Sequence, residues 1–294
     1  MMNDKKIFLE DAKIISQTSH KGSQHIIRLE APKCSESAIP GSFVHLSCDP
    51  SIPMRRPLSI METNPKQQWI DLLYKPIGNG LEHLTKKKIG DIISCLGPIG
   101  NGFNIEKDRS SILAIGGGVG IPPIYFLANY LKNYKNIEVF VMMGSEVPFP
   151  LKTSKDNGLI NGIPDNTTKT INNIKKLGFK SRLASHSDIE GCFKGYVTEL
   201  AEKWLKTKTN KELNNIQIIS CGPEPMLEAT ALLAKKFNLP CQIAVEEFMA
   251  CGVGGCAGCT IKIKTKNGYE MKRVCVDGPV FKANEVYSEM FKDK

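Results

Sequence analysis

Four cysteines in the last fifty residues have the spacing of a metal site. Cys251, Cys256 and Cys259 form a C-x4-C-x2-C run, and Cys275 follows further along the chain. This spacing is one by which four thiolates bind the two irons of a [2Fe–2S] cluster. The glycines between Cys251 and Cys256 allow a tight loop, because glycine accepts positive φ and close approach. The run therefore predicts electron-transfer chemistry.

Zinc and disulfide bonds are the alternatives for these cysteines. Zinc ribbons usually show two paired C-x2-C knuckles, whereas the run here has the spacing found in plant-type ferredoxins. A disulfide framework is possible in principle, but the other cysteines have no regular spacing and are typical of thiols in a reducing compartment. They are Cys34, Cys48, Cys95, Cys192, Cys221 and Cys241. The pattern favours the cluster and leaves zinc as its rival.

A glycine-rich turn in the middle of the chain is a candidate phosphate site. The apolar run 112–115 predicts a buried strand, and residues 122–132 have a helical pattern. Between them lie Gly116, Gly117, Gly118, Val119 and Gly120. A turn that opens a helix presents free backbone N–H groups and a positive dipole end, and both favour phosphate. The turn lacks the G-x-G-x-x-G pattern, so plain packing remains an alternative.

Two shorter motifs are weaker when each is taken alone. Cys221, Gly222 and Pro223 follow a predicted strand at 217–220, and ligands of open α/β sheets bind at that edge. Arg56, Pro57, Leu58 and Ser59 combine a forked cation with a hydroxyl, which suits a phosphate. A generic Gly-Pro turn and a surface arginine beside a rigid proline are the alternatives.

The elements that must position these residues change in type along the chain. The first hundred residues contain short apolar runs separated by turns, which predicts an antiparallel β-barrel or sandwich. From residue 111, strands alternate with helices, which predicts a parallel sheet. We expect a barrel domain at 1–108, an α/β domain at 109–240 with an insertion at about 150–180, and a cluster module at 241–294. We expect the insertion to be either a lid or a dispensable loop.

Composition limits the classes of function. With 294 residues and 41% hydrophobic content, the chain can bury the cores of two domains. The net charge of +9 is mild and the lysines are spread out, so we expect no nucleic-acid partner. We find no signal peptide and no apolar stretch long enough to span a membrane. We therefore expect a cytoplasmic protein without a membrane partner.

Taken together, the motifs resemble the ferredoxin-reductase superfamily, in which a flavin-binding barrel precedes a nicotinamide-nucleotide domain. The cysteine module at the C-terminal end makes the chain similar to the electron-transfer subunits of NAD-linked dihydroorotate dehydrogenase. Further matches are Leu73-Tyr74-Lys75, the segments at 97–103 and 249–252, and the segment at 274–281. The resemblance runs from about Phe8 to Phe281 and is interrupted mainly at 145–185.

The resemblance implies FAD, a [2Fe–2S] cluster and NAD as cofactors. It places Arg56, Pro57, Leu58, Ser59, Leu73, Tyr74, Lys75, Gly80 and Leu81 at the FAD, and the glycine turn and Cys221-Gly222-Pro223 at the nucleotide. Lys75 stands where the family often has arginine, so the bidentate fork is lost. Leu81 stands where the family has threonine, so a hydroxyl contact to the FAD pyrophosphate is lost.

The function implied is an electron relay in pyrimidine biosynthesis. It would connect NAD, through FAD and the cluster, to a separate dihydroorotate dehydrogenase FMN subunit in a heterotetramer. The choice of NAD over NADP also comes from the resemblance. An NAD(P)H:ferredoxin-type or electron-bifurcating reductase subunit is an alternative built from the same parts. A redox sensor or a zinc-stabilised assembly factor is the alternative without catalysis.

Overall fold

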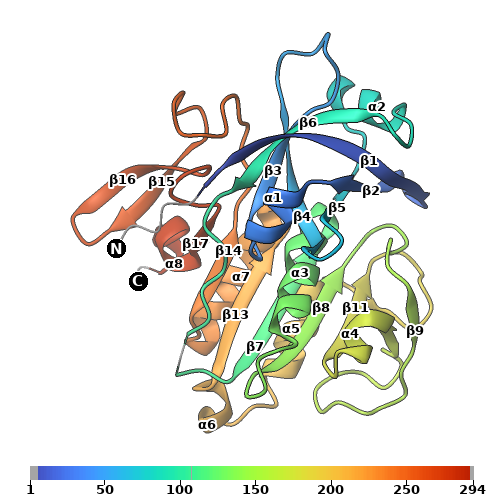
Figure 1. The fold of residues 1–294 in the computed structure, drawn as a ribbon. Coiled ribbons are helices and arrows are strands. Elements are labelled where there is room, and N and C mark those ends of the chain that lie inside the picture. The colour runs from blue at the N-terminus through green and yellow to red at the C-terminus, as the bar shows by residue number, and fades with distance from the viewer. Residues whose placement is uncertain (1–5, 107, 292–294) are drawn as a thin grey trace.

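Six antiparallel strands close into a barrel in the first hundred residues (Figure 1). The structure, a computed structural model, describes residues 6–106 and 108–291. The strands follow one another around the barrel in the order β1-β2-β5-β4-β3-β6. Their bounds are β1 Phe8–His20, β2 Gln24–Glu30, β3 Phe43–Ser47, β4 Arg56–Asn64, β5 Trp69–Tyr74 and β6 Ile92–Ile99, with helices α1 Pro32–Ser37 and α2 Asn79–Thr85. The predicted β-barrel is confirmed.

A seven-stranded sheet lies beside the barrel, in the order β12-β11-β8-β7-β13-β14-β17. Its strands are parallel except for β17, which runs antiparallel to β14. The strands are β7 Ser111–Gly117, β8 Glu138–Gly144, β11 Lys180–Ser185, β12 Phe193–Lys194, β13 Ile216–Cys221, β14 Cys241–Ala244 and β17 Val280–Lys282. The helices are α3 Ile121–Leu131, α4 Asn172–Lys176, α5 Val197–Leu205, α6 Asn210–Leu213 and α7 Glu224–Phe237, and η1 spans Gly118–Gly120.

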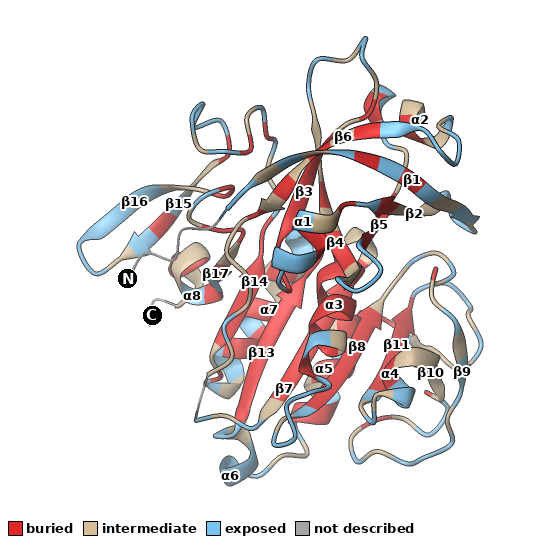
Figure 2. Cartoon of the chain, in the orientation of Figure 1, coloured by how far each residue is buried: buried red, intermediate tan, exposed pale blue. Residues whose placement is uncertain are grey.

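Both faces of the central strands are buried, as a parallel sheet requires (Figure 2). Because side chains alternate along a strand, Leu113 and Ile115 of β7 join a core cluster with residues of α5 and α7. Ile112 and Ala114 point to the other face and join residues of α3 and α4. The strands predicted at 112–115 and 217–220 are both present, and the expected fold class is confirmed.

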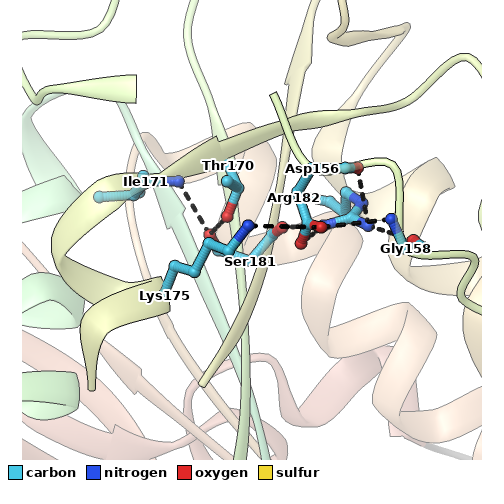
Figure 3. A network of polar contacts seen from close by, with 7 residues as sticks. All are labelled: Asp156, Gly158, Thr170, Ile171, Lys175, Ser181 and Arg182. Atoms are coloured by element: carbon cyan, nitrogen blue, oxygen red, sulfur yellow. Dashed lines mark hydrogen bonds and ion pairs between the residues drawn. The ribbon is translucent and has the colours of Figure 1, made fainter. Parts of the chain in front are cut away.

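The 150–180 segment is folded onto the sheet. Strands β9 (Thr153–Lys155) and β10 (Lys169–Ile171) form a two-stranded sheet. Arg182 of β11 is only 2% exposed, and its guanidinium reaches back to Asp156 and to the carbonyl of Gly158 (Figure 3). On the same strand, Ser181 bonds with the Thr170 hydroxyl and accepts from the Ile171 amide. A buried guanidinium needs such partners, so the segment is an integral part of the domain.

The segment that carries the four cysteines is inserted between two neighbouring strands of the sheet. The chain leaves β14, forms a hairpin of β15 (Thr260–Thr265) and β16 (Gly268–Arg273), and returns to the sheet through β17. The hairpin projects away from the sheet (Figure 1). Helix α8 (Ala283–Val286) and the 3-10 turn η2 (Ser288–Phe291) end the described chain. In the described part of the chain, none of the helices is long and apolar enough to cross a membrane.

Candidate cofactor and cluster site

The four candidate ligands lie in two pairs. The sulfurs of Cys259 and Cys275 are 3.4 Å apart, and both residues are buried. Cys251 and Cys256 lie on the outer part of the loop, where Cys256 is exposed. The amide of Cys256 lies 3.4 Å from the Cys251 sulfur. Two thiolates on one tetrahedral metal at about 2.3 Å lie about 3.8 Å apart, so the inner pair has the separation of ligands that share one iron.

Backbone N–H groups converge on the outer sulfurs. Although burial acts to raise it, N–H groups from Cys256, Val253 and Gly255 lower the pKa of the Cys251 thiol to about 6. The Gly258 amide lies 3.4 Å from the Cys256 sulfur. Donors of this kind stabilise thiolates, which are the form that binds metal. The loop is therefore organised to hold deprotonated sulfur.

At Cys275 of the inner pair, the surroundings favour the neutral thiol, whereas at Cys251 they favour the thiolate. Burial and the neighbouring Cys259 thiol raise the pKa of Cys275 to about 12. Cys275 therefore keeps its proton until a cation replaces it. Within residues 6–106 and 108–291, no three His, Cys, Asp or Glu side chains form a group tight enough to hold one metal ion. In a [2Fe–2S] cluster each iron takes two thiolates, and Cys259 and Cys275 have the separation of two such ligands.

Glycines make the tight path of the ligand loop possible. Gly252 and Gly254 have φ values of +68° and +83°, which other residues rarely adopt. A Cβ on Gly254 would come within 2.5 Å of a methyl of Val276, and one on Gly252 would come within 2.8 Å of Nδ1 of His45. Arg273 of β16 closes the loop by donating to the Gly254 carbonyl at 3.0 Å.

The barrel is joined to the cluster segment at Asn101. Its side-chain amide donates to the carbonyls of Val276 and Asp277, and its backbone amide donates to the carbonyl of Gly278. The 97–103 and 274–281 segments, which the resemblance singled out separately, therefore contact each other. This contact holds the chain directly after Cys275 against the end of the barrel.

Arg56 and Gly80 come together although they are 24 residues apart in sequence. A Cβ on Gly80 would lie 2.7 Å from Nε of Arg56, so the guanidinium lies directly over the start of α2. Arg56 also donates to the backbone carbonyls of Met54 and Arg55. Pro57 and Ser59 follow on β4 at half-buried positions, and Leu58 points into the barrel core. This arrangement is a cationic cradle of the kind that holds a phosphate.

The 73–75 segment lies at the end of β5, beside this cradle on the same barrel. Leu73 and Tyr74 are buried, and Lys75 is half-buried. The Tyr74 ring stacks on His25, with centroids 5.2 Å apart. Its hydroxyl is buried without a hydrogen-bond partner among the described residues, and burial raises its pKa. An orphaned buried hydroxyl is costly, so it fits a donor or acceptor supplied by a bound ligand. Leu81 packs against the barrel core.

The glycine turn and the Cys221 motif meet at one edge of the sheet. Cys221 pairs with Gly116 on the neighbouring strand, and a Cβ on Gly120 would come within 2.3 Å of the Cys221 carbonyl. A Cβ on Gly117 or Gly222 would meet the flexible end of the Met226 side chain, which would have to move. Gly118 has a φ of +55°, Val119 is half-buried, and Pro223 is the N-cap of α7. Gly118 and Val119 are the partly exposed residues of this turn, at the edge where such sheets bind ligands.

The two candidate cofactor sites share helix α3. This helix begins directly after the glycine turn and packs against β4, the strand that begins at Arg56. Phe126 of α3 belongs to the barrel core, whereas Met61 of β4 belongs to the core that α3 forms with the sheet. Helix α3 therefore fixes the barrel cradle relative to the sheet edge.

Sequence reasoning missed two residues at these sites. His45 is completely buried and faces the ligand loop; burial lowers its pKa, and the charges of Arg55 and Arg56 act in the same direction. Glu246 follows β14, and its charge acts on the buried Cys221 thiol, whose pKa is raised mainly by burial. Burial also raises the pKa of Glu246. A histidine within the apolar run 43–46 was a visible signal, whereas the approach of Glu246 to Cys221 depends on the fold.

Comparison with known proteins decides the family. The family model for the iron–sulfur cluster binding domain of dihydroorotate dehydrogenase B matches residues 246–287. The electron transfer subunit of dihydroorotate dehydrogenase B (NAD(+)) from Caldanaerobacter subterraneus subsp. tengcongensis is 33% identical over 248 residues, which cover 84% of this chain and 86% of that protein. The chain belongs to this family. The subunit of the same name from Desulforamulus reducens is 30% identical over 97% of this chain and 99% of its own length.

Solved structures show how widely the fold of this dihydroorotate dehydrogenase B subunit family is shared. An NADH-dependent reduced ferredoxin-NADP oxidoreductase, described for flavin-based electron bifurcation, aligns with a TM-score of 0.76 at 24% identity, over 96% of this chain and 91% of that chain. Phthalate dioxygenase reductase aligns with a TM-score of 0.55 at 12% identity, over 90% of this chain and 76% of that chain. At these identities the likeness shows the fold alone. The resemblance expected from the motifs is confirmed by the relatives.

Proposed function

We propose that this chain is an electron-transfer subunit that relays electrons between NAD and a dihydroorotate dehydrogenase catalytic subunit. One observation carries the proposal. Gly116, Cys221 and Ala244 form a row across three neighbouring strands, and the chain runs from Ala244 directly into the ligand loop. The nucleotide edge and the cluster loop therefore begin at the same side of the sheet.

The chain's own residues divide the work of binding. Arg56 and Gly80 hold the FAD pyrophosphate. The buried Tyr74 hydroxyl, which has no hydrogen-bond partner among the described residues, forms a hydrogen bond with the same cofactor. The turn Gly116–Gly120 and Cys221-Gly222-Pro223 hold NAD, and Cys251, Cys256, Cys259 and Cys275 hold the [2Fe–2S] cluster. When bound there, FAD would supply two-electron hydride exchange with NAD, and the cluster would supply one-electron transfer. The protein positions these groups and keeps them at fixed distances.

The division of the chain follows this assignment. We propose a FAD-binding unit at 1–108, a NAD-binding unit at 109–240 and a cluster module at 241–294. Strand β14 opens the module, and β17 returns it to the sheet. The module is therefore tied to the NAD-binding unit at both ends.

The partner is an FMN-containing dihydroorotate dehydrogenase subunit, in a heterotetramer of two subunits of each kind. The relatives are named as electron transfer subunits, which supports a separate catalytic subunit. The face around the outer ligands suits docking, because Cys256 is exposed and the Phe248 side chain is 94% exposed. Val253 and Val276 add apolar surface on the same loop region. Exposed apolar groups around a redox centre support the placement of the partner here.

Two measurements test the proposal. Anaerobically purified protein should be yellow-brown, with flavin bands and the broad shoulder of a [2Fe–2S] cluster, and it should contain iron. Colourless protein that contains zinc would reject the relay and favour an assembly factor. Copurification from the native host should yield a dihydroorotate dehydrogenase subunit. Recovery of a flavin or iron–sulfur subunit of another pathway instead would favour the bifurcating-reductase alternative.

A further inference from the structure

A single buried histidine lies between the flavin-binding strands and the cluster loop. His45 is on β3, opposite Pro57 of β4 and Leu96 of β6. Its neighbours Val44 and Leu46 point into the barrel core, so the His45 side chain points out of the barrel. There it meets Gly252, whose Cβ would lie 2.8 Å from Nδ1 of the ring. His45 is therefore the contact between a flavin strand and the ligand loop.

The surroundings of the His45 ring leave it without hydrogen bonds. The residue is 0% exposed, and neither ring nitrogen has a hydrogen-bond partner among the described residues. The backbone carbonyls of Arg55 and Cys251 lie near enough to act on the ring. An imidazole always carries at least one N–H, and leaving it unpaired in the interior is costly. The backbone carbonyl of Cys251 is the acceptor that the ligand loop offers to this donor.

The backbone of His45 is held firmly in place, whereas its ring nitrogens are unpaired. Arg55 donates to the His45 carbonyl at 3.2 Å and to the Ser94 carbonyl at 2.9 Å, and it also donates to the Ser94 hydroxyl. Arg55, the residue before Arg56, therefore joins β3 to β6. The ring therefore projects from a fixed point, and it can restrain whatever it bonds.

We propose that His45 is a positioning residue that ties the cluster loop to the flavin barrel, by donating a hydrogen bond from its imidazole to the backbone carbonyl of Cys251. The tie fixes Cys251, the first cluster ligand, relative to β3. It thereby also fixes Cys251 relative to Pro57, which lies opposite His45 on β4. It rests on the proposed function, because it needs a cluster in the loop and a flavin on the barrel. Electron transfer falls steeply with distance and disorder, so a loose loop would slow transfer between flavin and cluster without affecting hydride exchange.

The test compares three variants of the holoprotein. His45→Phe keeps a ring of similar shape but has no N–H, and His45→Asn returns a donor close to the position of Nδ1. Ile99→Val is the packing control, because Ile99 also contacts Gly252, at 3.3 Å from the position of its Cβ, and carries no polar group. Stopped-flow mixing with NADH separates flavin reduction from the bleaching of the cluster. Hydrogen exchange measures the protection of the amides at 252–256.

We expect His45→Phe to reduce flavin at a rate within about twofold of the wild type, and to transfer electrons to the cluster about tenfold more slowly. Loss of one buried hydrogen bond should speed amide exchange at 252–256 about five- to tenfold. His45→Asn should restore both readouts, and Ile99→Val should change neither. Wild-type transfer and wild-type exchange in His45→Phe would overturn the proposal, as would equal changes in Ile99→Val.

If His45→Phe does not retain its cluster, His45→Ala takes its place, measured with and without added imidazole. Recovery of transfer with imidazole, but not with thiophene, would support the tie, and no recovery would reject it. The wild-type spectrum keeps this result separate from the proposed function. A wild-type protein without flavin or cluster would contradict the relay itself. If the wild-type protein contains both cofactors and the variants behave like it, only the role of His45 is contradicted.

Discussion

The guanidinium of Arg56 occupies the space where a side chain on Gly80 would begin, with Nε 2.7 Å from the position of that Cβ. The two residues come from β4 and α2, so the contact builds one cradle from two separate elements. Any side chain at Gly80 must displace the guanidinium. The affinity for FAD should therefore depend on both residues as a unit.

We predict that Gly80→Ala weakens FAD binding by about 10- to 100-fold, because displacement of Arg56 would remove the charge-assisted hydrogen bonds that we propose it donates to the pyrophosphate. Arg56→Lys should weaken binding to a similar extent, since lysine lacks the fork. The double variant should be little weaker than either single variant, because both lose the same interaction. Titration of the apoprotein with FAD, followed by flavin fluorescence, gives the three dissociation constants. Additive losses would show that Gly80 acts independently of Arg56.

Cys256→Ser should remove the cluster and leave the flavin. Cys256 is the exposed ligand of the outer pair, so its replacement changes no core packing. Electron delivery to the partner subunit should fall below detection, while reduction of FAD by NADH stays within about twofold of the wild type. Iron analysis and stopped-flow absorbance measure these quantities. Loss of flavin reduction in a folded Cys256→Ser protein would contradict the division of labour.

The two glycines at 252 and 255 should differ sharply in their tolerance of alanine. Gly252 has a φ of +68° and faces the His45 ring, whereas a Cβ on Gly255 would meet nothing within 4 Å. Gly252→Ala adds both backbone strain and a collision, at a cost of about 1–3 kcal/mol for the strain alone. We expect its cluster content to fall several-fold, and that of Gly255→Ala to stay at the wild-type level. The ratio of iron to protein after identical purification is the measurement, and equal iron content in the two variants would contradict it.

Asp156 should give the 150–180 segment a pH-dependent stability. Although burial opposes it, the Gly158 amide and the Arg182 guanidinium lower the pKa of Asp156. A carboxylate with a depressed folded pKa stabilises the fold above its unfolded pKa of about 3.9, and this contribution is lost as pH falls through the folded pKa. Asp156→Asn should therefore lower Tm at pH 6, with the difference from wild type shrinking below about pH 4. Asp188→Asn, on an exposed loop, is the charge-matched control. A difference that does not change with pH would contradict this account.

Local patterns were sufficient to predict much of the fold. The buried strand at 112–115 and the glycine turn after it are defined by residues next to each other in sequence, and the structure contains β7 and η1 there. The cysteine spacing likewise predicted a loop, and the structure places Cys259 within 3.4 Å of Cys275. These features depend on chain geometry within a few residues, or on a hairpin that brings its two ends together.

The contacts that assemble the site could not be predicted in the same way. The Arg56–Gly80 cradle, the Asn101 bonds to 276–278 and the approach of His45 to Gly252 all join segments that are distant in sequence. Each depends on how barrel, sheet and module pack, which hydrophobic periodicity does not specify. For the same reason, residue patterns did not decide whether 150–180 is a lid or a dispensable loop. The partners of Arg182 that hold this segment lie more than twenty residues before it.

The position of the cysteine segment between β14 and β17 has a consequence for the life of the protein in the cell. Because β17 is the last strand of the sheet and is joined to it through β14, the chain must pass through the whole cluster loop before the sheet can be completed. Until that stretch has been made and has folded back, β14 is an exposed edge of the sheet. Exposed edges invite aggregation and proteolysis. The folding of the cysteine segment therefore decides how long this edge of a newly made chain stays exposed.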